Sequence, residues 1–496
     1  MALFPTLTTI TGMSLVLAAH LQAVEMREAI SQYGVTWTFD KAYPTGQFIT
    51  GDFWVVGPVR VISVTPKPGP VDADAMVSKK NHFGDTVLKP DTRMRNGSMV
   101  VVTFSGNHAY DSRMQGNYDE TFASVFPLSL EVERSLISTV SNDLPGGQNL
   151  AHPLMWQSEK KVATALKSAA VLTCLAQEPP ADAFRPASVG TIKTLYRESQ
   201  IHWDRLNTVI PPSPPPWAEL ERYFERPWID HMASWTIQSI GPCDNNPVYG
   251  REFSRLTGLA ALALNTAATK EEKRKTLIGL IQYGIDVQGV IAHGANWMAD
   301  GGHYSGRKLP LFFAGMMLGV EDMTKPAPEI RFQEDMDTYY AKTWFGAPVS
   351  FQMTTHHGPQ RAYEDIPPAQ WNQFDKRSES YRICCNGRAW IATALTMRLM
   401  DGGMKAWKHD AFFDYCDRWM APEDEYATAR ATFPRSKDEG TAFDEFVTQM
   451  WKAHRAETQA QPLSGFSRRW VWTMEGDTAK APGSWLDNVR LADYPK

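Results

Sequence analysis

The spacing of apolar residues changes its period near the middle of the chain, and this change limits the folds open to it. Before about residue 185, short runs rich in β-branched and aromatic residues alternate or are broken by Gly and Pro, as at 35–39 and 98–104. Such runs are typical of strands. We therefore expect residues 24–185 to form an antiparallel β-rich region resembling a sandwich, with the run 162–175 as either strand or helix.

After residue 217 the apolar residues recur at the spacing that is typical of helices. The segment 186–216 reads as a Pro-rich linker that ends in Pro-Pro-Ser-Pro-Pro-Pro at 211–216, a typical polyproline II sequence. Beyond it, Thr269 and Glu272 form a capping box at the start of a long amphipathic run. Further helices are expected at 252–264, 309–318, 388–400 and 411–420, several of them apolar nearly all round and hence buried.

Together these patterns predict a mainly α protein with an N-terminal antiparallel β-rich region. Paired helices separated by polar, aromatic loops favour an (α/α) toroid, or barrel, over residues 217–425. Residues 426–496 are polar and less regular, and we expect them to pack on the toroid. A nucleotide site is not expected, because no strand leads through a Gly-rich loop into a helix.

Composition and charge indicate which kinds of partner and which cellular compartment to expect. The chain has 496 residues, with 50 Lys and Arg against 55 Asp and Glu, a net charge of −5. Since no dense basic tract is present, a nucleic-acid partner is not expected. Residues 1–23 carry no Lys, Arg, Asp or Glu and resemble an imperfect signal peptide that is too short to span a membrane. We expect an exported protein, periplasmic or secreted; a short buried helix is the alternative.

Five cysteines are too few and too unevenly spaced for a disulfide framework, and no Cys-x-x-Cys pair suggests zinc. The adjacent Cys384 and Cys385 cannot easily bridge each other, so we expect all five to be small buried apolar side chains. His356 and His357 invite a metal interpretation, but neighbouring side chains point apart and no third ligand is evident. Neither a metal nor another cofactor is expected.

Polar side chains gather in four loops of the helical region, at 243–252, 293–307, 354–365 and 379–388. The loop 293–307 has four glycines, which let the backbone approach a ligand closely, beside His, Tyr, Asp and Arg. The alternative for each loop is a structural turn with a helix cap. The residues that we expect to contact substrate are Asn245, Tyr249, Arg251, Asn296, Trp297, Tyr304, Arg307, His357, Tyr381 and Arg382.

Two reactions fit these loops. The β-elimination of a uronic-acid polysaccharide needs a group that neutralises the C6 carboxylate, a base for the C5 proton and an acid for the leaving O4. One of each type is available on separate loops: Asn245 or Asn246, His303, Arg361 and Tyr363. Glycoside hydrolysis needs two opposed carboxylates, and no pair is marked out by spacing. A non-catalytic glycan-binding protein is a third alternative.

The order Asn245-Asn246, Asp300-Gly301-Gly302-His303 and Arg361-Ala362-Tyr363 resembles the alginate and glucuronan lyases of polysaccharide lyase family 38. The resemblance covers roughly residues 217–420 and implies an (α/α)7 barrel that acts on an anionic polysaccharide. By matching type and order, it implies that Asn246 and Arg361 hold the carboxylate. It also implies that Tyr363 is the acid, with a further role as base, and that His303 is the base or orients it. The β-rich region has no counterpart in that family.

Seventeen tryptophans are unusual in a chain of this size. We expect Trp390, Trp407 and Trp419 to pack within apolar helices. Others lie near the polar loops, where their rings could stack on sugars: Trp235, Trp297, Trp344 and Trp371.

Overall fold

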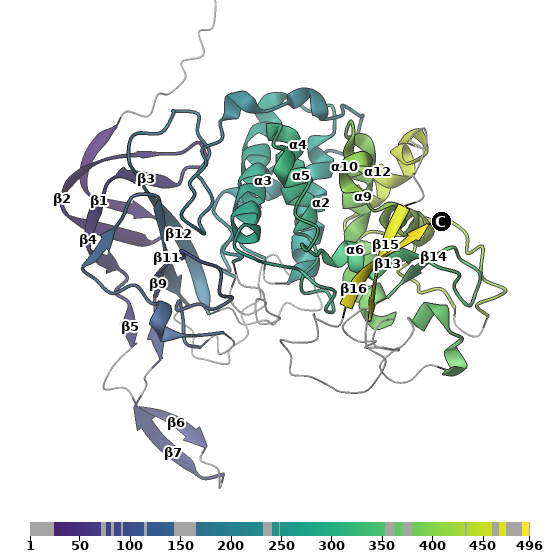
Figure 1. Cartoon of the computed structure of the whole chain (residues 1–496), viewed down its shortest axis with the longest axis horizontal. Helices are drawn as coiled ribbons and strands as arrows, with labels where there is room; N and C mark the ends of the chain where they lie inside the picture. Colours follow the sequence, from purple (N-terminus) through teal and green to yellow (C-terminus); the bar gives the residue numbers. More distant parts are fainter. Residues whose placement is uncertain are drawn as a thin grey trace, which may run out of the picture.

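The computed structural model in Figure 1 places a curled β-sheet beside a larger helical part. It describes residues 24–70, 76–80, 84–90, 93–113, 117–142, 165–231, 241–247, 249–352, 363–370, 379–431, 434–458, 466–472 and 489–495. Among these residues, no helix is both long and apolar enough to cross a membrane.

The main sheet has the strand order β10-β4-β2-β3-β12-β11-β9, and β1 pairs with β2 outside this path. The parallel pairing of β12 with β3 makes the sheet mixed rather than antiparallel, and a single curled sheet replaces the expected sandwich. Since the apolar run 162–175 contributes β12, its helical alternative is wrong. The strands are β1 (Glu25–Gln32), β2 (Val35–Gln47), β3 (Phe53–Val56), β4 (Val59–Thr65), β9 (Ser98–Val100), β10 (Leu128–Leu130), β11 (Arg134–Ser141) and β12 (Leu166–Leu175).

Both faces of the central strands are buried. Successive side chains of a strand point to opposite faces, and on β11 Leu136 joins the core around Trp37 whereas Ile137 joins the core around Tyr110. Two small strand pairs extend from this part: β5 (Gly69–Pro70) with β8 (Met94–Arg95), and β6 (Met76–Lys80) with β7 (Thr86–Pro90). The β6–β7 hairpin projects away from the main sheet in Figure 1.

The helical part is built on α2 (Gly250–Leu264), which contacts α3 (Lys270–Ile291), α4 (Lys308–Leu318) and α9 (Arg388–Leu399). The capping box is confirmed: Glu272 N–H donates to Thr269 Oγ1 at 3.2 Å, and Thr269 N–H donates to Glu272 Oε2 at 2.8 Å. The other helices are α1 (Trp217–Phe224), α5 (Glu321–Thr324), α6 (Gln333–Asp337), α10 (Gly403–Trp407), α11 (Asp410–Met420) and α12 (Glu445–His454).

The expectation of an (α/α) toroid is wrong. A toroid repeats hairpins of comparable helices around a ring, whereas this chain follows α4 with the short helices α5 and α6 and then with strands. A hairpin of β13 (Thr338–Tyr340) with β14 (Val349–Phe351) interrupts the helical part, and an antiparallel pair of β15 (Phe466–Trp472) with β16 (Val489–Pro495) follows α12. The fold is therefore mixed, and its helices form an irregular layer beside the sheet (Figure 1).

Arg185 joins the sheet to the helices. It is fully buried and donates to Asp52, just before β3, at 2.7 Å and to Asp286 of α3 at 2.9 Å. The segment 186–216 then packs against both parts through buried Val189 and Ile201, while the run 211–216 lies outside any helix or strand. The two parts thus share a buried ionic contact rather than a free linker.

Candidate functional site

Three aromatic side chains from separate segments meet beside the Gly-rich loop that precedes α4. Tyr249 stands at the start of α2, His303 lies in the loop, and Tyr381 comes directly before a π-helical turn, Arg382–Gly387. The rings of Tyr249 and His303 meet edge-on with 4.9 Å between centroids, and Tyr381 packs against Tyr249. The Tyr249 hydroxyl accepts a hydrogen bond from Gly302 N–H at 3.1 Å and donates to Cys385 Sγ at 3.3 Å.

Two loop glycines permit this close approach. Gly301 has a φ of +58°, and a Cβ there would lie 3.1 Å from the Tyr381 ring. A Cβ on Gly302 would lie 2.6 Å from Cβ of Cys385. Only glycine tolerates both the left-handed conformation and such crowding. The glycines at 301 and 302 are therefore required by the way this loop packs.

Polar residues from α6 and the π-helical turn hold the loop in place. The Gly301 carbonyl accepts hydrogen bonds from Gln333 Nε2 at 2.7 Å and Asn386 Nδ2 at 2.9 Å. Tyr304 N–H donates to Gln333 Oε1 at 3.1 Å, and Gly306 N–H donates to Glu334 Oε1 at 2.7 Å. Gln333, Glu334 and Asn386 could not be predicted from the sequence, because no motif marks a buried side chain that binds a loop backbone.

The site keeps three titratable side chains within reach of solvent, since Asp300, His303 and Tyr381 are half-buried. Burial raises the pKa of Asp300 above its ordinary value. The neighbouring Tyr304 is 8% exposed, and burial followed by the charge of Asp300 raises its pKa as well. An imidazole, a phenol and a carboxyl group with a raised pKa can together accept and donate protons near neutral pH.

Three arginines expected to bind substrate are engaged inside the protein. Arg307 is fully buried and forms two hydrogen bonds with Asp230, at 2.9 and 2.8 Å. Arg251 pairs with Glu252 at 2.9 Å. Arg382 forms ion pairs with three carboxylates: Glu379 at 2.7 Å, Glu439 at 2.7 Å and Glu364 at 3.8 Å.

The amides and the tryptophan expected at the site also have internal partners. Asn245 donates to the backbone carbonyls of Tyr223 and Arg226, while Asn246 accepts from Ile229 N–H at 2.5 Å. Asn296 accepts from Arg331 N–H at 2.8 Å. Trp297 is 2% exposed and stacks on Phe332, so its ring has no free face for a sugar.

Several expected residues lie outside the described part of the chain: Trp235, His356, His357, Arg361 and Trp371. For Tyr363 the structure describes the backbone, in the turn Tyr363–Asp365. The next residue, Glu364, bonds Arg418 at 2.5 Å and lies 3.8 Å from Arg382. The backbone of residue 363 is therefore brought toward the segment that carries Tyr381.

A disulfide joins Cys384 to Cys385, so the expectation that these adjacent cysteines do not bridge is wrong. The pair lies in the π-helical turn beside Tyr249, where Cys384 is exposed and Cys385 is buried. Cys174 and Cys416 are buried free thiols, as expected, whereas Cys243 is half-exposed. Within the described residues, no three His, Cys, Asp or Glu side chains are placed to hold a metal ion.

Comparisons with known proteins found no matching family model, curated protein or solved structure. The geometry around His303 is therefore the basis for a functional proposal.

Proposed function

We propose that this protein is a polysaccharide lyase that cleaves a uronic-acid-containing anionic glycan by β-elimination. The observation that carries the proposal is the half-buried His303, held edge-on against Tyr249 beside Tyr381 and Asp300. β-Elimination at a sugar acid needs a base and an acid at one position, and an imidazole with a nearby phenol supplies both.

In this proposal His303 takes the C5 proton of the uronate. A tyrosine, Tyr381 or Tyr363, then protonates the leaving O4, so that the proton removed by one group is matched by a proton given by another. Tyr249 is a positioning residue, because its hydroxyl is bonded within the protein and its ring orients the imidazole. The roles of His303, Tyr249 and Tyr381 are supported by their positions in the loop cluster, whereas the role of Tyr363 rests on the resemblance to family 38.

The sugar carboxylate needs a group that neutralises its charge. Burial raises the pKa of Asp300, which lessens, at a given pH, the negative charge that the sugar carboxylate would meet in this loop. Arg361 remains the proposed cation, on the basis of the resemblance to family 38. The net charge of −5 does not oppose an anionic substrate, because local potential in the site governs attraction. We also propose that the protein is exported.

Glycoside hydrolysis is the second candidate, and the raised pKa of Asp300 favours it, because such a carboxyl is suited to protonate a leaving oxygen. Hydrolysis needs a second carboxylate that reaches the sugar. Burial, with a smaller contribution from the charge of Asp300, raises the pKa of Asp337. The Asp337 side chain is fully buried, however, and does not reach the sugar. Asp337 therefore does not supply the second carboxylate that hydrolysis requires.

The test is incubation with alginate, glucuronan and sulfated uronans, followed by mass spectrometry of the products. A lyase cleaves without adding water, so one product is an unsaturated oligosaccharide lighter by one water than its hydrolytic counterpart. Products that all carry the added water would contradict the lyase proposal and support hydrolysis. Binding of these glycans without any product would support a non-catalytic glycan-binding protein.

A further inference from the structure

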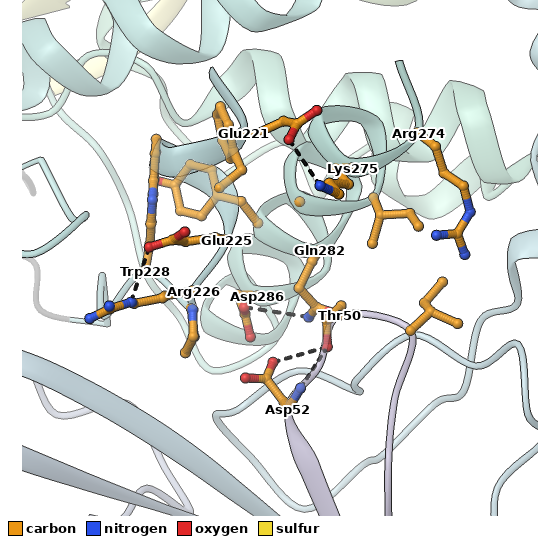
Figure 2. Close-up of a pocket in the computed structure, with 16 residues that line it drawn as sticks. Thr50, Asp52, Glu221, Glu225, Arg226, Trp228, Arg274, Lys275, Gln282 and Asp286 are labelled. Atoms are coloured by element: carbon orange, nitrogen blue, oxygen red, sulfur yellow. Dashed lines mark hydrogen bonds and ion pairs between the residues drawn. The ribbon is translucent and has the colours of Figure 1, made fainter. Parts of the chain in front are cut away.

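A cavity lies at the seam between the sheet and the helices, and its lining does not include His303. It has a volume of about 290 Å³ and is lined by the turn between β2 and β3, the end of α1 and one side of α3. Figure 2 shows Asp52, Gln282 and Asp286 near one end of it and the Glu221–Lys275 pair near the other. This volume is enough for a small organic molecule.

At the floor of the cavity two carboxylates share one guanidinium group. The cations elsewhere in the lining each have a carboxylate partner of their own: Arg226, Arg274 and Lys275. Arg185 is the one described cation bonded to both Asp52 and Asp286, and all three side chains are buried. Burial raises the pKa of Asp52, although Arg185 opposes this effect; when both carboxylates are ionised, the triad has a net charge of −1. A buried charge without a partner is costly, so this floor favours a bound cation.

Two buried oxygen atoms of the lining have no hydrogen-bond partner among the described residues. They are Oδ1 of Asp52, which is 1% exposed, and Oε1 of Gln282, which is 5% exposed. The rest of each side chain is occupied: Asp52 Oδ2 accepts from Arg185 and Thr50, and Gln282 Nε2 faces Asp286 Oδ2 at 3.5 Å. Both orphaned atoms are acceptors, so the missing group is a donor.

Part of the wall above this floor is apolar and aromatic, although charged side chains line the rest of the cavity. Ile49, Phe224 and Ile278 line the cavity, and Trp228 stacks on Phe224 with 4.8 Å between ring centroids. A bare metal ion would leave this surface uncovered, whereas a ligand with an apolar body would bury it. Aromatic faces also attract organic cations.

We propose that this cavity binds a small organic amine, with its ammonium group donating to Asp52 Oδ1 and Gln282 Oε1 and its apolar body against Phe224 and Ile278. The proposal is independent of the lyase proposal, because none of these side chains belongs to the His303 cluster.

The test is calorimetric titration of the full chain with benzylamine, which is a cation near neutral pH, and with benzyl alcohol, its neutral counterpart. We expect benzylamine to bind at least roughly tenfold more tightly, a factor that corresponds to about 1.4 kcal/mol. Equal affinities, or no binding of benzylamine, would overturn the proposal.

Two variants locate the binding. Asp52→Asn removes the charge, and it should abolish the preference for benzylamine over benzyl alcohol. Because Asp52 also bonds Arg185, this variant can lose stability, so Gln282→Leu provides a second measurement that keeps every charge. We expect Gln282→Leu to weaken benzylamine binding several-fold.

Gln288→Leu is the matched control. Gln288 lies on the same helix and also has a buried Oε1 without a partner in the described structure, but it does not line the cavity. This variant should bind benzylamine like the unmodified protein. If Gln282→Leu and Gln288→Leu bind it equally well, the assigned position is wrong.

Discussion

The ring of Tyr249 meets the ring of His303 edge-on at a centroid distance of 4.9 Å, and the Tyr249 hydroxyl is fixed by the Gly302 amide. Edge-to-face contacts of this kind favour one orientation of the imidazole. A half-buried histidine is thereby held by a buried tyrosine, which is 5% exposed. This relationship connects the Gly-rich sequence of the loop to the proposed proton transfer.

Tyr249→Phe should keep the ring and remove only the hydroxyl. Since Gly302 N–H then loses its acceptor, the loop that carries His303 is expected to loosen. We expect kcat on a polyuronate to fall roughly tenfold, with a small change in KM and a shifted pH profile, because alignment rather than binding is lost. If Tyr249 had only a structural role, the variant would have a lower melting temperature but the same kcat per folded molecule.

The disulfide between Cys384 and Cys385 predicts a specific labelling pattern. Alkylation of the denatured, unreduced chain should modify Cys174, Cys243 and Cys416 only, and prior reduction should add two further labels. Peptide mass spectrometry measures both states. Five labels without reduction, on protein purified under oxidising conditions, would show that the pair is reduced.

Stability at acidic pH should depend on His231. Its ring nitrogen lies 3.1 Å from the Tyr110 hydroxyl, and burial, with a smaller effect from His108, lowers its pKa to about 3. The unfolded chain takes up this proton near pH 6.5, so stability contributed by the neutral ring is lost as pH falls from 6.5 toward 3.

The variant His231→Gln keeps a polar side chain but does not titrate. Urea unfolding at pH 7 and pH 5 should show a smaller loss for the variant, by up to about 2 kcal/mol. Equal losses for the two proteins would mean that His231 binds a proton in the folded state as readily as in the unfolded state.

Arg382 should be among the most costly charged residues to replace. Although burial alone would raise the pKa of Glu439, the guanidinium of Arg382 is the main group that lowers it to about 2. Removing Arg382 leaves Glu379 and Glu439 without this cation. Arg382→Met should therefore reduce the free energy of unfolding by about 3–5 kcal/mol, measured in urea.

Arg205→Met is the control for this substitution. Arg205 forms an exposed pair with Asp401 at 3.6 Å, with side-chain exposures of 42% and 86%. Its replacement should cost less than about 1 kcal/mol. Equal effects of the two variants would show that the Arg382 cluster contributes no more than a surface pair.

The sequence predicted the local structure well where one segment determines it. The capping box at Thr269 and the apolar run of α4 follow from spacing alone. The parallel pairing of β3 with β12 joins residues more than a hundred positions apart, and local pattern contains no information about it. The prediction of a toroid was wrong for the same reason, because the helical spacing of apolar residues does not determine how helices are arranged around one another.

The candidate site was predictable in part. The glycines at 301 and 302 and the nearby His303 marked the loop that the structure places beside Tyr249 and Tyr381. Arg307 looked available in the sequence because its carboxylate partner Asp230 is 77 residues away. Arg382 has one partner nearby, Glu379, but a second partner, Glu439, lies 57 residues away. Only the folded chain shows that these guanidinium groups are already paired.

The most direct test of the proposed function is the ratio of unsaturated ends to new reducing ends in one digest of a polyuronate. β-Elimination makes one unsaturated end, seen by ultraviolet absorbance, for each new reducing end, so the proposal predicts a ratio near one. It also predicts that His303→Gln lowers both signals together. New reducing ends without ultraviolet absorbance would contradict the account.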